Sequence, residues 1–187
     1  MFAVVVGHNS RSQGAVRKDT GETEFSWNSR LADMIDALSH RPEYAGLFVR
    51  VFHRDPRIGS YRREIEDVYR RTDKWGADVT VELHFNSHHN PKATGTETLS
   101  SGSRMSTKYA YALQEEMLDA LDLKDRGKKI VRTGRGSASL ISGKAPAALI
   151  EPFFGSSDKG LAATDEPEEM KALAHAVLKA THDVFCK

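Results

Sequence analysis

Four residues of types that bind metals or move protons stand where apolar stretches of the sequence end or begin. His8, His84 and Glu151 each lie at or just past the end of a short apolar stretch, and Glu24 lies at the start of a segment with helical spacing. If the three stretches are parallel strands, their ends meet at one edge of the sheet and the side chains converge. Two imidazoles and one carboxylate form the nitrogen and oxygen donor set of a catalytic zinc ion, which leaves a fourth position for water.

Each of these residues could instead have a purely structural role. Spacing in the sequence alone does not decide between a structural and a functional role. A single histidine at a strand end is more often a hydrogen-bonded structural residue than a metal ligand. Glu151 gives the sharper signal, because it follows the apolar run Ala-Ala-Leu-Ile and a carboxylate buried without a partner is costly. Its alternative role is to cap the loop that follows.

Other residues compete for the same roles. Glu22 lies only two residues from Glu24 and is a rival for the carboxylate ligand. His88 and His89 follow His84 closely in the sequence. The strand-end position favours His84 as a ligand, because the other two histidines belong to a loop.

Strand-like and helix-like segments alternate along the chain. Short apolar stretches at residues 2–6, 47–53, 79–83 and 147–150 predict strands. Apolar residues at helical spacing predict helices over about residues 22–39, from a cap at Ser60 to Gly76, from near Ser106 to Leu121, and over about residues 165–185. We therefore expect an α/β fold, a three-layer sandwich with a mainly parallel central sheet and helices on both faces.

Length and composition fit one domain spanning residues 1–187, with 27 basic against 26 acidic side chains. This balance favours neither a nucleic-acid partner nor a membrane surface. We expect no membrane span and a monomer.

The only cysteine, Cys186, leaves no internal disulfide and no thiolate cluster. A transition metal would therefore need histidine and carboxylate ligands.

A basic, glycine-bearing loop is expected from Lys128 to Gly136. It lacks the Gly-Lys-Ser/Thr ending of a phosphate-binding loop, and no aromatic residues are interleaved with its cations. Either it is a solvated surface loop, or it lies near the metal site and meets carboxylates of the substrate.

Four motifs occur in an order and at intervals that resemble those of a known enzyme family. They are Val5-Val6-Gly7-His8-Asn9, Gly21-Glu22-Thr23-Glu24 with Asn28 four residues on, Glu82-Leu83-His84-Phe85-Asn86-Ser87, and Ala148-Leu149-Ile150-Glu151-Pro152-Phe153-Phe154. The segments between these motifs also resemble the family, at Arg54, Gly76-Ala77-Asp78 and Gly95-Thr96-Glu97. Along nearly the whole chain the sequence resembles the zinc-dependent N-acetylmuramoyl-L-alanine amidases of the amidase-3 type.

The resemblance implies a role for each of the four residues. It implies that His8, Glu24 and His84 are the zinc ligands and that Glu151 is the family's essential glutamate, acting as the catalytic base. Glu24 is preferred to Glu22 because it keeps the family's interval to Asn28.

The sequence departs from the family pattern around the first histidine. Val5-Val6 stands where the family usually has Asp-Pro, and Asn9-Ser10 replaces the usual Gly-Gly. His53 occupies a position where the family tends to have threonine, either as an extra polar group near the site or as a surface residue. These differences affect details of substrate binding more than metal binding.

The implied activity is zinc-dependent hydrolysis of the amide between N-acetylmuramic acid and L-alanine in peptidoglycan, as in a phage-type endolysin. The N-terminus lacks the charged region, long apolar region and cleavage site of a secretory signal, and its apolar run is too short to span a bilayer. We expect synthesis in the cytoplasm without a signal peptide. The protein would act on the cell wall after release during lysis, or after export by another route.

Three other functions are compatible with parts of the sequence. A metallopeptidase or another small amidohydrolase could use the same four residues on a different amide. A catalytically silent cell-wall-binding module would keep the fold, but it would not need a base such as Glu151. A nucleotide-binding domain is disfavoured because no phosphate-cradling glycine pattern follows the first strand.

Overall fold

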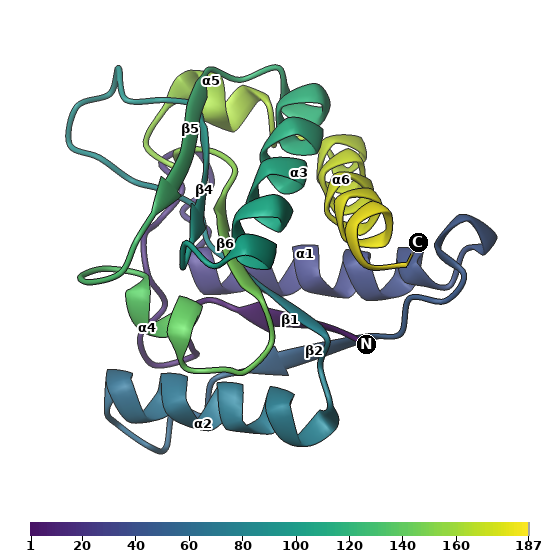
Figure 1. Cartoon of the computed structure of the whole chain (residues 1–187). Coiled ribbons are helices and arrows are strands. Elements are labelled where there is room, and N and C mark those ends of the chain that lie inside the picture. The colour runs from purple at the N-terminus through teal and green to yellow at the C-terminus, as the bar shows by residue number, and fades with distance from the viewer. Residues whose placement is uncertain (187) are drawn as a thin grey trace.

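A six-stranded sheet forms the centre of the computed structural model, which describes residues 1–186 (Figure 1). Its strands are β1 (Phe2–Val6), β2 (Val49–His53), β3 (Val79–Leu83), β4 (Thr96–Ser100), β5 (Asp125–Ile130) and β6 (Ala147–Glu151), in the order β2-β1-β3-β6-β4-β5. The first four in that order are parallel to one another. β4 runs antiparallel to β6 and parallel to β5. The prediction of a mainly parallel sheet is confirmed.

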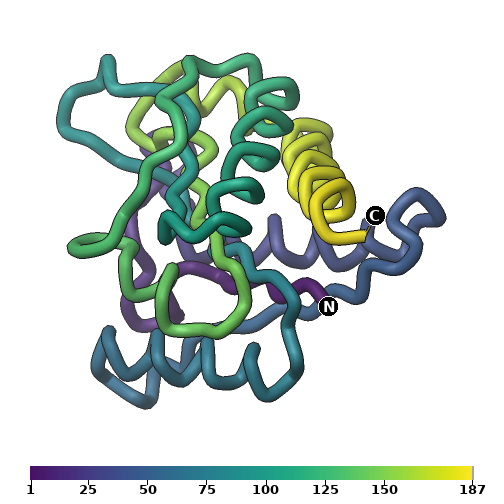
Figure 2. Tube along the Cα trace, viewed as in Figure 1, coloured from purple at the N-terminus to yellow at the C-terminus, as the bar shows by residue number. Residues whose placement is uncertain are grey.

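Helices cover both faces of the sheet (Figure 1). They are α1 (Glu24–Ser39), η1 (Pro42–Tyr44), α2 (Tyr61–Trp75), α3 (Arg104–Leu121), α4 (Ser137–Ile141), α5 (Asp158–Ala162) and α6 (Pro167–Phe185). The tube in Figure 2 shows α3 and α6 side by side, although they are far apart in the sequence. β1 contributes Val4 and Val6 to the core with α1, α3 and α6, and Ala3 and Val5 to the core with α2. The predicted three-layer sandwich is confirmed.

The central strands are buried on both faces, which explains their composition. Every residue of β1, β3, β4 and β6 is buried. A strand covered by helices on both sides loses the alternation of apolar and polar residues that marks a half-exposed strand. The polar residues Thr80 and Glu82 of β3 are therefore interior residues. Glu82 has specific partners, whereas the Thr80 hydroxyl has none among the described residues.

Several predicted boundaries differ from the structure for local reasons. Ser60 stands at the start of α2, as predicted, but its side chain makes no capping hydrogen bond. The third helix begins before Ser106, because Ser103 is the residue whose side chain caps it. The expected loop from residue 128 is partly wrong, since residues 128–130 complete β5.

The ends of three parallel strands meet at one edge of the sheet. Val6 of β1 lies in register with Leu83 of β3, and Leu83 lies in register with Ile150 of β6. The residues that follow these three positions therefore emerge at the same edge. Within the described residues, no helix has the length and apolar character needed to cross a membrane.

Candidate metal centre

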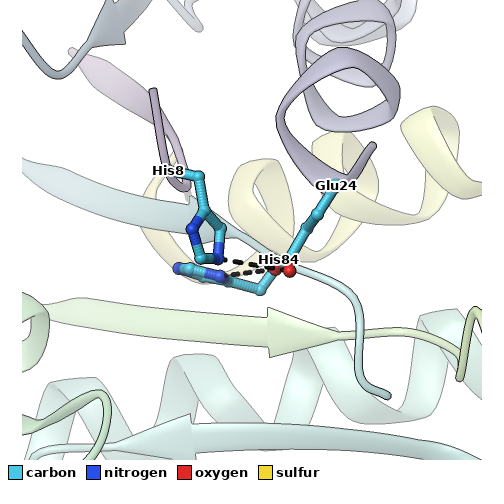
Figure 3. Close-up of side chains that lie close together, drawn as sticks. All are labelled: His8, Glu24 and His84. Carbon is cyan, nitrogen blue, oxygen red and sulfur yellow. Dashed lines mark hydrogen bonds and ion pairs between the residues drawn. The ribbon is translucent and has the colours of Figure 1, made fainter. Parts of the chain in front are cut away.

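His8, Glu24 and His84 come together at this edge of the sheet (Figure 3). One ligand atom from each residue lies within 4.8 Å of the others. The Nε2 atom of His8 is 3.2 Å from Oε2 of Glu24, and Nδ1 of His84 is 2.8 Å from Oε1 of Glu24. The two imidazole rings meet edge to face, with their centroids 5.1 Å apart. The carboxylate thus lies between two imidazole nitrogens.

His8 reaches the site through an unusual backbone conformation. Its φ angle is +66°, in the left-handed region that few residues other than glycine adopt. The following turn is fixed by Asn9, whose Oδ1 accepts hydrogen bonds from the backbone N–H groups of Arg11 and Ser12. The Asn9 amide also donates to the buried Glu64. The sequence Asn9-Ser10 therefore supports the turn that presents His8.

Glu24 is held in place by the start of α1 and by two neighbouring loops. Thr23 caps the helix, and the N-terminal turn of a helix favours a carboxylate. The backbone N–H of Ala15 donates to Oε2 at 3.0 Å, and that of Phe85 donates to Oε1 at 3.2 Å. The carboxylate is almost completely buried. These bonds aim both oxygens toward the histidines.

Two glycines allow the three residues to approach one another. A Cβ atom on Gly7 would lie 2.3 Å from the carbonyl oxygen of Leu83 and 2.6 Å from the His84 ring. A Cβ on Gly14, where φ is +78°, would lie 2.6 Å from Oε2 of Glu24. Any larger residue at either position would push the site apart.

The donor set fits a metal ion. Because a carboxylate only accepts hydrogen bonds, either a hydrogen on Nδ1 of His84 or a metal ion must lie between that atom and Oε1 of Glu24. Nε2 of His8 is buried and has no hydrogen-bond partner among the described residues. A buried imidazole nitrogen without a hydrogen-bond partner, facing a carboxylate oxygen, is suited to bind a metal ion.

The charges of the group also favour a bound cation. Burial alone would raise the pKa of Glu24, but its contacts with His8 and His84 hold that pKa far below its ordinary value. Burial opposes the charged form of His84, yet the carboxylates of Glu24 and Glu82 raise its pKa to about 9. Glu24 is thus held ionised and His84 is held in its protonated form, so a metal ion would take the place of the proton on Nδ1 of His84.

Glu151 closes β6 and faces the same pocket as the two histidines. The pocket has a volume of about 380 Å³, and its wall includes His8, His84 and Glu151. The Glu151 side chain is 6% exposed, and its Oε2 has no hydrogen-bond partner within the described part of the chain. Burial raises its pKa above the ordinary value. A carboxyl group with a raised pKa holds a proton more readily than an ordinary carboxylate does, which suits a group that takes up and releases protons.

The competing residues lie elsewhere. Glu22 forms an ion pair with Arg30 at 2.8 Å and is not part of the group of three ligand atoms. His53 ends β2 and packs against Phe25, and it lines a different pocket. His88 and His89 are exposed and stack on each other, with ring centroids 4.1 Å apart.

Other pocket residues had only weak sequence signals. Arg135, in the glycine-bearing segment, and Tyr61, at the start of α2, line the pocket beside Glu151. Glu82 contacts His84 from inside β3. The sequence gives one indication of this role. Glu82 is a charged residue in an otherwise uncharged strand, and it lies two positions before the candidate ligand His84.

Known proteins resemble this chain in family pattern and in fold. The model of the Amidase_3 family, described as N-acetylmuramoyl-L-alanine amidase, matches residues 3–183. No curated protein matches the chain. The chain is similar in structure to the catalytic domain of CwlV, an N-acetylmuramoyl-L-alanine amidase from Bacillus (Paenibacillus) polymyxa, with 21% identity, a TM-score of 0.77, and coverage of 98% of this chain and 97% of that one.

Two further structures have similar folds. One is an N-acetylmuramoyl-L-alanine amidase from Clostridium difficile 630, with 20% identity, a TM-score of 0.78, and coverage of 100% of this chain and 97% of that one. The other is the catalytic domain of the CD27L endolysin, described as targeting Clostridia difficile, with 21% identity, a TM-score of 0.81, and coverage of 97% and 96%. From the family match over residues 3–183, the chain belongs to the Amidase_3 family of N-acetylmuramoyl-L-alanine amidases.

Proposed function

We propose that this amidase is zinc-dependent, with His8, Glu24 and His84 as the ligands and Glu151 as the catalytic base. The observation that carries the proposal is the meeting of three ligand atoms within 4.8 Å, next to a pocket that also contains the buried Glu151. The bond cleaved is the amide between N-acetylmuramic acid and L-alanine of peptidoglycan. Family membership supports this substrate.

The reaction needs a nucleophile, a stabilised oxyanion and a proton for the departing amine. When bound, zinc lowers the pKa of its water from 15.7 to about 7 and polarises the carbonyl group. Glu151 takes up the proton of the attacking water through its unpartnered Oε2 and then delivers it to the leaving nitrogen. Its raised pKa helps it to hold the proton between the two transfers.

The pocket wall supports this role for Glu151. Leu99 and Leu149 provide an apolar wall that limits the access of water to the carboxylate. Arg135, in the basic segment, also lines the pocket and supplies a cation for carboxylates of the peptide stem. The basic segment is therefore a substrate-binding element in this proposal, and it is not a nucleotide-binding loop.

The biological setting follows from the same proposal. Residues 1–187 form one catalytic domain, active as a monomer, that degrades cell walls. The structural likeness to the catalytic domain of an endolysin supports a role in lysis. In this setting the protein reaches the wall after release during lysis or by export.

Digestion of purified peptidoglycan tests the proposal. The metal-free chain, supplied with zinc, should release L-alanine amino termini without creating new reducing sugar ends, and a chelator should stop the release. Release of amino termini from within the peptide stem would indicate a metallopeptidase. Binding to the wall without any release would indicate a silent binding module.

A further inference from the structure

A second carboxylate lies behind the proposed metal centre, inside the sheet. Glu82 belongs to β3, two residues before His84, and its side chain is 0% exposed. Its Oε1 lies 2.8 Å from Nε2 of His84, the ring nitrogen that faces away from Glu24. The His84 ring is thus held between two carboxylates, one at each nitrogen.

The partners of Glu82 fix the direction of this hydrogen bond. Arg54 donates to Oε1 of Glu82 from its guanidinium group, and the Tyr69 hydroxyl donates to Oε2 at 2.8 Å. Both oxygens of Glu82 accept hydrogen bonds from these two donors, so Glu82 also meets His84 as an acceptor. Nε2 of His84 must therefore carry a hydrogen and donate it.

The hydrogen on Nε2 leaves the other ring nitrogen available as a ligand. Nδ1 is the atom that faces Glu24, and a neutral imidazole with a proton on Nε2 has its lone pair on Nδ1. We propose that Glu82, held by Arg54 and Tyr69, is a positioning residue that sets the tautomer and ring orientation of His84 for zinc binding. This inference rests on the proposed metal site.

Stability alone gives little reason for such an arrangement. Replacing a buried ion pair with apolar residues of similar volume is often neutral or stabilising, because burial removes the water around both charges. Val5 of β1, in register with Glu82, belongs to an apolar cluster with Ile65 of α2, so an apolar residue would suit this part of the interior. The buried charges are explained if His84 is a metal ligand that needs a fixed tautomer. A carboxylate that accepts from the other ring nitrogen of a ligating histidine fixes its tautomer and raises its metal affinity.

The most direct test observes the His84 ring of the unaltered chain by proton–nitrogen NMR, with zinc bound. We expect a slowly exchanging proton on Nε2 and a metal-shifted Nδ1 resonance. Zinc bound through Nε2, or an Nε2 atom without a proton, would overturn the inference while leaving the metal site in place. Failure of the chain to bind zinc would overturn both.

Two substitutions test the same inference through metal affinity. Glu82→Gln should weaken zinc binding by about 10- to 100-fold, because a neutral amide oxygen is a weaker acceptor for His84 than a carboxylate oxygen and no longer balances the charge of Arg54. Tyr69→Phe keeps the carboxylate and removes one donor, so it should weaken zinc binding by less. The affinity is measured by competition with a chromophoric chelator.

A core substitution distinguishes positioning from general destabilisation. Val177→Ala opens a cavity in α6, in the core on the far side of the sheet from Glu82. It should lower the unfolding temperature and leave the zinc affinity unchanged. If Glu82→Gln binds zinc as tightly as the unaltered chain, or loses no more affinity than Val177→Ala, Glu82 has no positioning role.

Discussion

Glu151 combines two properties that a proton-transfer residue needs and a structural residue avoids. It is nearly buried, yet one carboxylate oxygen has no partner among the described residues. Leaving such an atom unpaired is costly, and an amide in its place would keep the shape of the side chain without the ability to take a proton. Glu151→Gln should therefore retain zinc and lower turnover by about 10²- to 10⁴-fold.

The measurement compares zinc content and release of L-alanine amino termini for the two proteins. A variant that has lost its zinc would place Glu151 among the ligands. Undiminished turnover with zinc bound would remove its assignment as the base.

The raised pKa of Glu151 also predicts how activity depends on pH. The base must be ionised to accept a proton, so activity should be present above its pKa and lost as the pH falls through it. Burial raises this pKa above the ordinary value of 4.5, so the acid limb of kcat/KM should lie above that pH. Zinc affinity is measured over the same range, because protonated ligands would also lower activity. An acid limb that follows metal loss alone would contradict the assignment to Glu151.

At the residue scale, the sequence predicts which polar residues lie at strand ends, but it does not predict which side chains they contact. The positions of His8, His84 and Glu151 follow from where apolar runs stop, so the sequence was sufficient to nominate them. The contacts of Glu82 and Arg135 depend on segments distant in sequence that meet only in the fold. No local pattern encodes those contacts.

At the scale of the elements, the site depends on the close approach of β1 and β3. A Cβ on Gly7 would lie 2.3 Å from the Leu83 carbonyl oxygen, a backbone atom that cannot move without separating the strands. Gly7→Ala should therefore displace His84, lower the unfolding temperature and weaken zinc binding by at least about 10-fold, as loss of ligand orientation does.

Gly46→Ala is the matched control. A Cβ there meets nothing within 4 Å, although its φ of +92° makes the substitution strained. It should cost about 1–2 kcal/mol of stability and leave zinc affinity unchanged. Equal zinc affinities for both alanine variants would show that the approach of the strands does not shape the site.

The strands and helices could be predicted where they carry a strong apolar pattern. β1, α1 and α6 appear close to their predicted positions because their apolar residues recur at the spacing of a strand or a helix. β4, with the sequence Thr-Glu-Thr-Leu-Ser, was missed because its polar residues are buried by partners such as Gln114, Asn86 and Pro152. Such burial depends on tertiary contacts, which local propensity does not record.

At the scale of the whole molecule, zinc should connect parts of the chain that are far apart in sequence. His8 follows β1, Glu24 opens α1 and His84 follows β3, so all three can hold one ion only in the folded state. Zinc at about 100 times its Kd should then stabilise the fold by about 2.7 kcal/mol, which raises Tm by roughly 5–10 °C for a chain of this size.

The shift is measured by thermal unfolding of the metal-free chain with and without zinc. His84→Ala is the control, and it should show little or no shift because it lacks one ligand. A similar shift in both proteins would indicate that the stabilising zinc binds elsewhere.

The central claim is that one zinc ion is held by His8, Glu24 and His84. Anomalous diffraction from crystals of the zinc-loaded chain, recorded on both sides of the zinc absorption edge, tests it most directly. The account predicts one strong peak about 2.0–2.2 Å from Nε2 of His8, Nδ1 of His84 and a carboxylate oxygen of Glu24. A peak beside His88 and His89 alone, or no peak between these three side chains, would contradict it.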